Sequence, residues 1–185
     1  MPSDLSVQRV LDAAARKGVQ LEVVTFAQST HTAQEAADAV GAEIGQIVKS
    51  LVFITLRNEQ LQPCLALVSG ANTVDMERLG AVLGESRVRR ATADEARELT
   101  GYSIGGIPPF GHPQPLRTVM DPDLGRFQLI WAAAGTPNSV FAVPPATLRA
   151  LANAIVAPIC HVMAARTADD SGPDGLQPAS SAATR

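Results

Sequence analysis

Apolar residues recur along this chain at two spacings, and each spacing predicts one kind of secondary structure. Helical spacing predicts helices over residues 4–17, 32–41, 73–83, 92–101 and 144–151. Runs of apolar and β-branched residues predict strands over residues 21–26, 47–56, 61–69, 116–120, 127–132, 139–143 and 154–157. Because the helices do not alternate regularly with the strands, the pattern favours a mixed α+β sheet over a doubly wound nucleotide-binding fold.

Polar residues beside these segments indicate where helices begin and where a hairpin turns. Thr32 and Thr92 are each followed three residues later by Glu, which is a capping-box pattern. Ser3 or Asp4 is expected to cap the first helix, and Asn72 or Thr73 the helix that carries Met76, Leu79 and Leu83. The polar residues 57–60 are expected to form the turn between two adjacent strands.

Length and composition predict one domain. With 185 residues and 46% hydrophobic content, the chain is long enough for one well-filled core and short for two. We expect a single domain over residues 1–166. Residues 167–185 consist of Asp, Ser, Gly, Pro and Ala with hardly an apolar anchor, so they are predicted to be a disordered tail.

The charge balance limits the class of partner. A formal net charge of −3, from 15 Lys+Arg against 18 Asp+Glu, gives no general attraction to DNA, RNA or an anionic membrane. We therefore expect neither a DNA nor a membrane partner, and any RNA contact has to be local. Arg87-Val88-Arg89-Arg90 is the best local candidate, with Arg87 and Arg89 on one side of an extended segment; a solvated face explains it equally well.

The sequence lacks the common signatures of secretion, metal binding and nucleotide binding. The first residues have neither the basic start nor the apolar stretch of a signal peptide, so a cytoplasmic location is expected. Cys64 and Cys160 are too few and too far apart for a disulfide framework or metal knuckle, and are predicted to be core thiols. Without a phosphate loop or a paired-histidine zinc motif, we expect no cofactor and no metal.

A lysine interrupts the most apolar of the predicted strands. Lys49 shares a strand face with Ile47, Leu51 and Phe53. Its ammonium group either extends from the strand end or points into a polar cavity, since a buried charge is costly without a partner or an anionic ligand. The alternative is a solubilising charge near a sheet edge.

A second unusual segment is Gly101-Tyr102-Ser103-Ile104-Gly105-Gly106-Ile107-Pro108-Pro109-Phe110-Gly111-His112. Gly105 and Gly106 allow backbone angles closed to other residues and let a ligand approach the chain, while Pro108 and Pro109 stiffen the adjoining backbone. This composition is typical of a shaped binding loop, and equally of a structural turn between two elements. A thiol hydrolase built from Cys64 or Cys160 with a histidine is disfavoured, because nothing in the sequence brings these residues together.

Four segments carry a resemblance to a known family. Gln46 to Phe53, Leu67 to Asn72, Gly105-Gly106-Ile107-Pro108-Pro109 and Ala134 to Pro137 resemble, in order, the YbaK family of aminoacyl-tRNA editing domains. That family includes free-standing deacylases related to the editing insertion of bacterial prolyl-tRNA synthetases. The resemblance covers roughly residues 20 to 160 and implies a curved mixed β-sheet or partial barrel flanked by helices.

The resemblance also implies an activity and a set of site residues. It implies trans-editing hydrolysis of the ester that joins a small, wrongly attached amino acid to tRNA, with the substrate's own ribose hydroxyl helping to activate water. Lys49 would orient the acceptor end through phosphate or ribose contacts, and backbone amides of Gly105 and Gly106 would stabilise the oxyanion. The implied substrate-binding residues are Ile107, Pro108, Pro109, Ser69, Gly70, Asn72, Gly135 and His112.

Two partners and one alternative arise from this hypothesis. The expected partners are the acceptor end of an aminoacyl-tRNA and an aminoacyl-tRNA synthetase. The alternative is a non-catalytic regulator that captures a small amino acid or an aminoacyl nucleotide in a similar pocket. Hydrolysis of a panel of mischarged tRNAs separates the two hypotheses.

Overall fold

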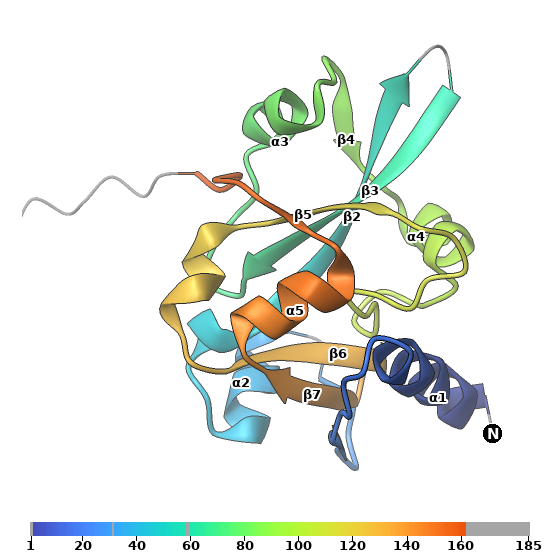
Figure 1. Ribbon diagram of the computed structural model, residues 1–185, viewed down its shortest axis with the longest axis vertical. Helices are drawn as coiled ribbons and strands as arrows, with labels where there is room; N and C mark the ends of the chain where they lie inside the picture. Colours follow the sequence, from blue (N-terminus) through green and yellow to red (C-terminus); the bar gives the residue numbers. More distant parts are fainter. Residues whose placement is uncertain (1, 31, 58–59, 162–185) are drawn as a thin grey trace, which may run out of the picture.

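The computed structural model describes residues 2–30, 32–57 and 60–161 (Figure 1). In these residues the predicted helices and strands occur in the predicted order, and a strand over Val88–Arg90 and two short 3-10 helices, which were not predicted, are added to them. The helices are α1 (Pro2–Ala15), α2 (Ala33–Val40), α3 (Met76–Leu83), α4 (Ala93–Thr100), α5 (Pro145–Ala152) and the short 3-10 helices η1 (Ile44–Gln46) and η2 (Pro122–Arg126). The strands are β1 (Val23–Thr25), β2 (Val48–Arg57), β3 (Gln60–Ser69), β4 (Val88–Arg90), β5 (Arg117–Met120), β6 (Ile130–Thr136), β7 (Ser139–Val143) and β8 (Ile155–Val156).

These strands form two sheets rather than one. A five-stranded mixed sheet has the order β4-β2-β3-β5-β8, with antiparallel pairs on the β4 side and parallel pairs on the β8 side. A three-stranded antiparallel sheet has the order β1-β7-β6. A single parallel bridge between Ile47 and Trp131 connects them. The predicted α+β class and mixed sheet are confirmed, and the two sheets form an open arrangement rather than a closed barrel.

The β2–β3 hairpin gives the lysine its position. Its ladder runs without interruption from Val48 opposite Ser69 to Arg57 opposite Gln60, close to the predicted strands. Lys49 lies opposite Val68, one pair from the end of the ladder. The lysine therefore lies beside the segment that leaves β3 toward α3.

The caps are partly as predicted. Thr32 and Thr92 form both predicted capping boxes, each with the Glu three residues later. The predicted caps of α1 and α3 are wrong. Helix α1 begins at Pro2, a favourable first position for a residue without an N–H group, and α3 is capped by Asp75, whose carboxylate accepts from the Glu77 and Arg78 amides.

The predicted bounds of β6 are also wrong. The apolar pattern places this strand at residues 127–132, with a loop after it. The strand instead starts at Ile130 and continues to Thr136 through a β-bulge, and η2 occupies the residues just before it. Gly135 has a φ of 99°, which allows the chain to pass through the bulge without ending the strand.

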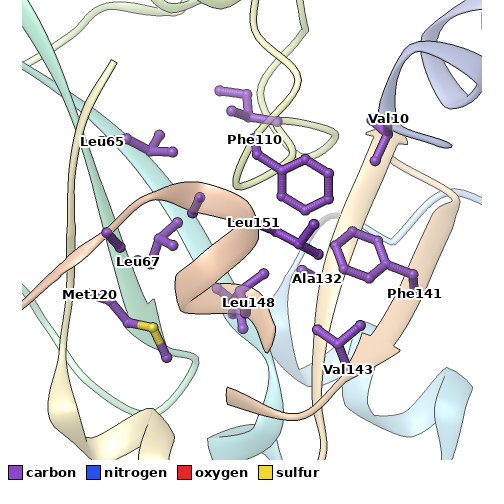
Figure 2. Close-up of a cluster of buried hydrophobic side chains, with 14 of the residues drawn as sticks. Val10, Leu65, Leu67, Phe110, Met120, Ala132, Phe141, Val143, Leu148 and Leu151 are labelled. Carbon is purple, nitrogen blue, oxygen red and sulfur yellow. The ribbon is translucent and has the colours of Figure 1, made fainter. Parts of the chain in front are cut away.

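The largest core cluster lies between the two sheets. Helix α5 lies between the β3–β5 region and the β6–β7 hairpin, with Leu148 and Leu151 directed into the cluster (Figure 2). The rings of Phe110 and Phe141 meet there edge to face, with centroids 5.7 Å apart. Phe110 thereby attaches the segment after the two prolines to the core. A second cluster, which includes Leu79 and Val119, covers the other face of the larger sheet.

The smallest cluster packs α2 against the bridge between the sheets. It contains Ala36, Ala37 and Ile47, with Trp131 packed against it. The small residues on this helix allow close packing. No helix in the described ranges is both long and apolar enough to cross a membrane.

Candidate active site

A pocket of about 240 Å³ lies where the two sheets separate. Its walls come from α2, the edge of β2, the end of β4, β6 and the segment Ile104 to Ile107. In the described residues, strand β4 pairs with β2 only from Phe53 to Thr55, and β6 pairs with this part of the chain only through the bridge from Trp131 to Ile47, the residue before β2. Between these two contacts the edge of β2 has no neighbouring strand in the described structure and faces the pocket.

Lys49 lines this pocket and is held by two carbonyl groups. Its half-buried ammonium donates to the carbonyl oxygens of Gly70 at 3.0 Å and Asn72 at 2.5 Å. Burial lowers the pKa of Lys49, the nearby Cys160 opposes this shift, and Arg90 lowers the pKa further. An ammonium has three N–H groups, so one remains for a substrate.

Residues 69–72, which carry the two carbonyls that accept hydrogen bonds from Lys49, are held in place by contacts of their own. The Ser69 hydroxyl donates to the Gly45 carbonyl at 2.8 Å, and the Asn72 amide donates to the Asp123 carboxylate at 2.8 Å. A Cβ atom on Gly70 would lie 2.4 Å from the Ile44 carbonyl oxygen, so only glycine fits there. Ser69, Gly70 and Asn72 thus lie beside Lys49, and their side chains or backbone position the lysine.

The glycine loop, residues Ser103 to Ile107, forms another wall. Gly105 and Ile107 line the pocket, and Gly105 has a φ of 90°. The amide of Gly106 donates to the Ser103 carbonyl at 3.0 Å, whereas the described residues offer no acceptor to the amides of Gly105 and Ile107. The amides of Gly105 and Ile107 are therefore available as donors beside the pocket.

The rest of the predicted loop residues lie behind the pocket. Pro108 and Pro109 are buried and do not line it. Gly135 packs against α1, where a Cβ atom would lie 2.8 Å from the Ser6 carbonyl oxygen. Its neighbours Thr136 and Pro137 line the pocket instead. Pro108, Pro109 and Gly135 thus support the pocket wall from outside.

His112 lies in a different cavity. That cavity is bounded by α1, the end of α5 and the segment after the prolines. The imidazole packs edge to face on Tyr102, with ring centroids 5.8 Å apart, and neither ring nitrogen has a hydrogen-bond partner in the described structure. Burial lowers the pKa of His112 to about 4, although backbone groups of Thr100 and Pro108 oppose the shift.

Several pocket residues were missed as site residues in the sequence, among them Trp131, Ser50 and Arg90. Trp131, the single tryptophan of the chain, is half-buried in the wall formed by β6. Ser50 lines the pocket, and its buried hydroxyl has no partner among the described residues. Arg90 lines it from the end of β4. The signals were weak: a lone tryptophan in a strand, a serine in an apolar run, and one arginine of three.

The thiols do not take part in this arrangement. Neither Cys64 nor Cys160 lines the pocket. Burial raises the pKa of Cys64 to about 11, and burial together with Asp121 raises that of Cys160 to about 12. Both thiols are therefore protonated at neutral pH and unsuited to nucleophilic attack. Within the described residues, no group of three or more His, Cys, Asp and Glu side chains is placed to hold a metal ion.

The fold and the pocket define an α+β domain with a small cavity bordered by a lysine and a glycine loop. The family model described as aminoacyl-tRNA editing domain matches residues 27–151. The chain therefore belongs to the aminoacyl-tRNA editing domain family, and the resemblance to the YbaK family is confirmed.

Individual relatives agree with this assignment. The chain is 32% identical over 129 residues to a multifunctional Ser/Thr-tRNA deacylase, ProXp-y, of Escherichia coli K12, covering 69% of this chain and 77% of the relative. It is 30% identical over 95 residues to a proline–tRNA ligase of Limosilactobacillus fermentum, covering 51% of this chain and 17% of the ligase. The match to the ligase is thus confined to a small part of that enzyme.

A solved structure gives the same picture. The crystal structure of a candidate trans-editing enzyme for prolyl-tRNA synthetase superposes with a TM-score of 0.77 at 46% identity, covering 84% of this chain and 97% of the other. The expected enzyme class, an aminoacyl-tRNA deacylase, is supported by the relative named as a Ser/Thr-tRNA deacylase and by the structure of the candidate trans-editing enzyme.

Proposed function

We propose that this protein acts in trans to hydrolyse the ester of a mischarged tRNA that carries a small amino acid. The observation that carries the proposal is the pocket itself: a small cavity with Lys49 on one side and the open amides of Gly105 and Ile107 on another. The names of the relatives, a Ser/Thr-tRNA deacylase and a trans-editing enzyme, support the same reaction.

The size of the pocket supports a small aminoacyl group. A volume of about 240 Å³ lies below the roughly 300–1,000 Å³ of pockets that enclose drug-sized ligands. Small side chains, Ala33, Ala36, Ala132 and Ala133, form much of the lining. No Asp or Glu of the described ranges lines it, so a cationic amino acid side chain would lack a counter-ion there.

The reaction we propose uses the substrate as its own proton carrier. Among the residues that the structure describes, the pocket lining contains no His, Cys, Asp or Glu to act as a side-chain base. The free ribose hydroxyl next to the ester accepts a proton from the attacking water and passes one to the leaving ribose oxygen. The carbonyl carbon gains the water oxygen, the ester C–O bond breaks, and the products are a free amino acid and a tRNA with both ribose hydroxyls.

The residues of this chain then bind, orient and stabilise. Lys49 is held by the Gly70 and Asn72 carbonyls and directs its remaining N–H toward the acceptor end. The amides of Gly105 and Ile107 donate to the carbonyl oxygen as it becomes negative. An oxyanion donor of this kind contributes about 10²–10³ in turnover.

A synthetase is the second proposed partner. The match to a region of a proline–tRNA ligase, and to a candidate trans-editing enzyme for prolyl-tRNA synthetase, supports an association with that synthetase system. We propose that the protein removes amino acids that this synthetase attaches in error. The reaction would then take place in the cytoplasm, where translation occurs.

Deacylation of a panel of mischarged tRNAs tests the proposal. The full chain is incubated with tRNAs carrying Ala, Ser, Thr, Cys or Pro, and release of the amino acid is followed against buffer alone. We expect rapid release of at least one small, wrongly attached amino acid and much slower release from correctly charged tRNA(Pro). If every ester stays intact while Trp131 fluorescence reports binding, the protein is a non-catalytic binder.

A further inference from the structure

The charged residues of the pocket have one sign. Lys49 and Arg90 line it, and no Asp or Glu does in the part of the chain that the structure describes. The whole chain has a formal net charge of −3, so the pocket is locally positive in an acidic protein. Such an arrangement attracts an anionic ligand and raises its local concentration.

Arg90 stands at the place where the edge of β2 opens. It lies opposite Phe53 in the last pair of the β2–β4 ladder, and the next residue, Ala91, donates its amide to the Val52 carbonyl at 3.0 Å. Alternation along β4 places Arg90 on the same face as Val88, which packs against the α3 cluster, and on the face opposite Arg89. Arg90 therefore lies on the Lys49 face of β2 at the pocket rim.

Two other arginines of the same sheet, Arg89 on β4 and Arg117 on β5, already make side-chain contacts. Arg89 donates to both carboxylate oxygens of Glu95, at 2.8 and 2.7 Å, and this contact lowers the pKa of Glu95 to about 2. Arg117 donates to Glu85 and to the Leu83 carbonyl. The exposed guanidinium of Arg90 has no hydrogen bond or ion pair in the part of the chain that the structure describes.

We propose that Arg90 binds a phosphodiester of the tRNA acceptor end, next to the terminal adenosine whose ester lies in the pocket. The inference rests on the proposed function and adds a substrate-binding residue to it. A guanidinium fork fits two phosphate oxygens, and Lys49 supplies a point charge nearer the ester. The two residues thus have different roles. Lys49 orients the reacting end of the tRNA, and Arg90 binds the RNA backbone next to it.

A substrate pair isolates this contact. Mischarged tRNA contains the phosphodiester, and 3′-O-aminoacyl-adenosine contains the ester without any phosphate. Arg90→Gln is compared with Arg87→Gln, an exposed arginine of the same segment outside the pocket, and with Arg90→Lys. All proteins are full-length, and their melting temperatures check the fold.

We expect Arg90→Gln to lower kcat/KM on mischarged tRNA by about 10-fold, mostly through KM, because a charge-assisted contact to bound substrate is lost. Activity on aminoacyl-adenosine should fall much less. Arg90→Lys should recover part of the loss on tRNA, and Arg87→Gln should have a much smaller effect than Arg90→Gln. The slope of log KM against log salt should fall by about 0.7 for Arg90→Gln, since one phosphate contact to a single strand is removed.

Two outcomes would overturn the inference while the proposed function stands. Equal loss of activity on both substrates would make Arg90 a structural residue, and equal behaviour of Arg90→Gln and Arg87→Gln would reduce it to a general surface charge. If wild type hydrolyses nothing, the proposed function fails. The affinity of each variant for the dinucleotide CpA, followed by Trp131 fluorescence, then decides the Arg90 contact: unchanged affinity in Arg90→Gln contradicts it.

Discussion

Gly106 lies directly against the backbone of Thr136, so that a Cβ atom on Gly106 would stand 2.7 Å from the Thr136 Cα. This contact joins the glycine loop to the end of β6, two segments separated by thirty positions in the sequence. Both segments line the pocket, through Gly105 and Ile107 on one side and Thr136 and Pro137 on the other. A glycine at position 106 is therefore required by packing, while Gly105 is required by its positive φ.

The two glycines should respond differently to alanine. In Gly106→Ala the methyl group meets backbone atoms that no side-chain rotation can move, so the loop has to shift. We expect turnover to fall by about 10², the effect of displacing an oxyanion donor. Gly105→Ala has room, with the nearest atom 3.7 Å away, but its φ of 90° costs about 1–2 kcal/mol for a residue with a side chain.

Single-turnover deacylation of a good mischarged tRNA measures this prediction. Affinity for a non-hydrolysable aminoacyl-adenosine analogue, followed by Trp131 fluorescence, is measured beside it and should change much less. Wild-type turnover in both variants would show that the loop is a structural turn and that its amides do not take part in the reaction.

Replacing Lys49 should impair activity far more than stability. Lys49→Ala leaves the Gly70 and Asn72 carbonyls without their donor, at a cost of about 1–2 kcal/mol in unfolding free energy that solvent access to the half-buried site reduces. Deacylation should fall by at least about 10²-fold, because the acceptor end loses its orientation. Lys49→Arg should recover only part of it, since the planar fork differs from a point charge.

Thermal melting and deacylation assays on the same preparations check the Lys49 prediction. Lys17→Ala serves as the control, because that lysine also donates to two carbonyls, those of Ala150 and Leu151, but lies outside the pocket. Full activity in the folded fraction of a strongly destabilised Lys49→Ala protein would assign the lysine a purely structural role.

His112 should make stability depend on pH below neutrality. Its pKa is lowered from the ordinary 6.5 to about 4, so between these values the unfolded chain binds more protons than the folded one. The stabilising effect of a neutral His112 is complete above pH 6.5 and is lost as the pH falls toward 4, by up to about 3 kcal/mol.

Urea unfolding of wild type and His112→Gln at pH values from about 4.5 to 7.5 tests the titration. The variant should show a flatter dependence of unfolding free energy on pH than wild type. Identical slopes for wild type and His112→Gln would mean that another group titrates.

Removal of residues 167–185 should leave melting temperature and deacylation nearly unchanged. These residues lie outside the described structure, and the prediction comes from their composition, which offers little apolar surface to offset the entropy of ordering. The truncated chain and the full chain are compared at equal salt. A clear loss of tRNA affinity on truncation would give the tail a role in binding. The single domain over residues 1–166 likewise stays a prediction.

Local chemistry determined much of this protein from its sequence alone. The capping boxes at Thr32 and Thr92 and the β2–β3 hairpin depend on residues a few positions apart, and all were predicted. Lys49 and the glycine loop stood out because a charge in an apolar strand and paired glycines before prolines are unusual anywhere. The order of the four family segments then identified the family.

Only the tertiary structure decided which of these residues share a pocket. The glycine loop meets Thr136 because β6 runs through a bulge beside it, while His112, seven positions after Gly105, turns into another cavity. Because α4 lies beside β4, Glu95 accepts hydrogen bonds from Arg89 and not from Arg90, which lies at the pocket rim. Such pairings depend on the free energy of packing distant segments against each other. The spacing of residues along the chain does not reveal that free energy.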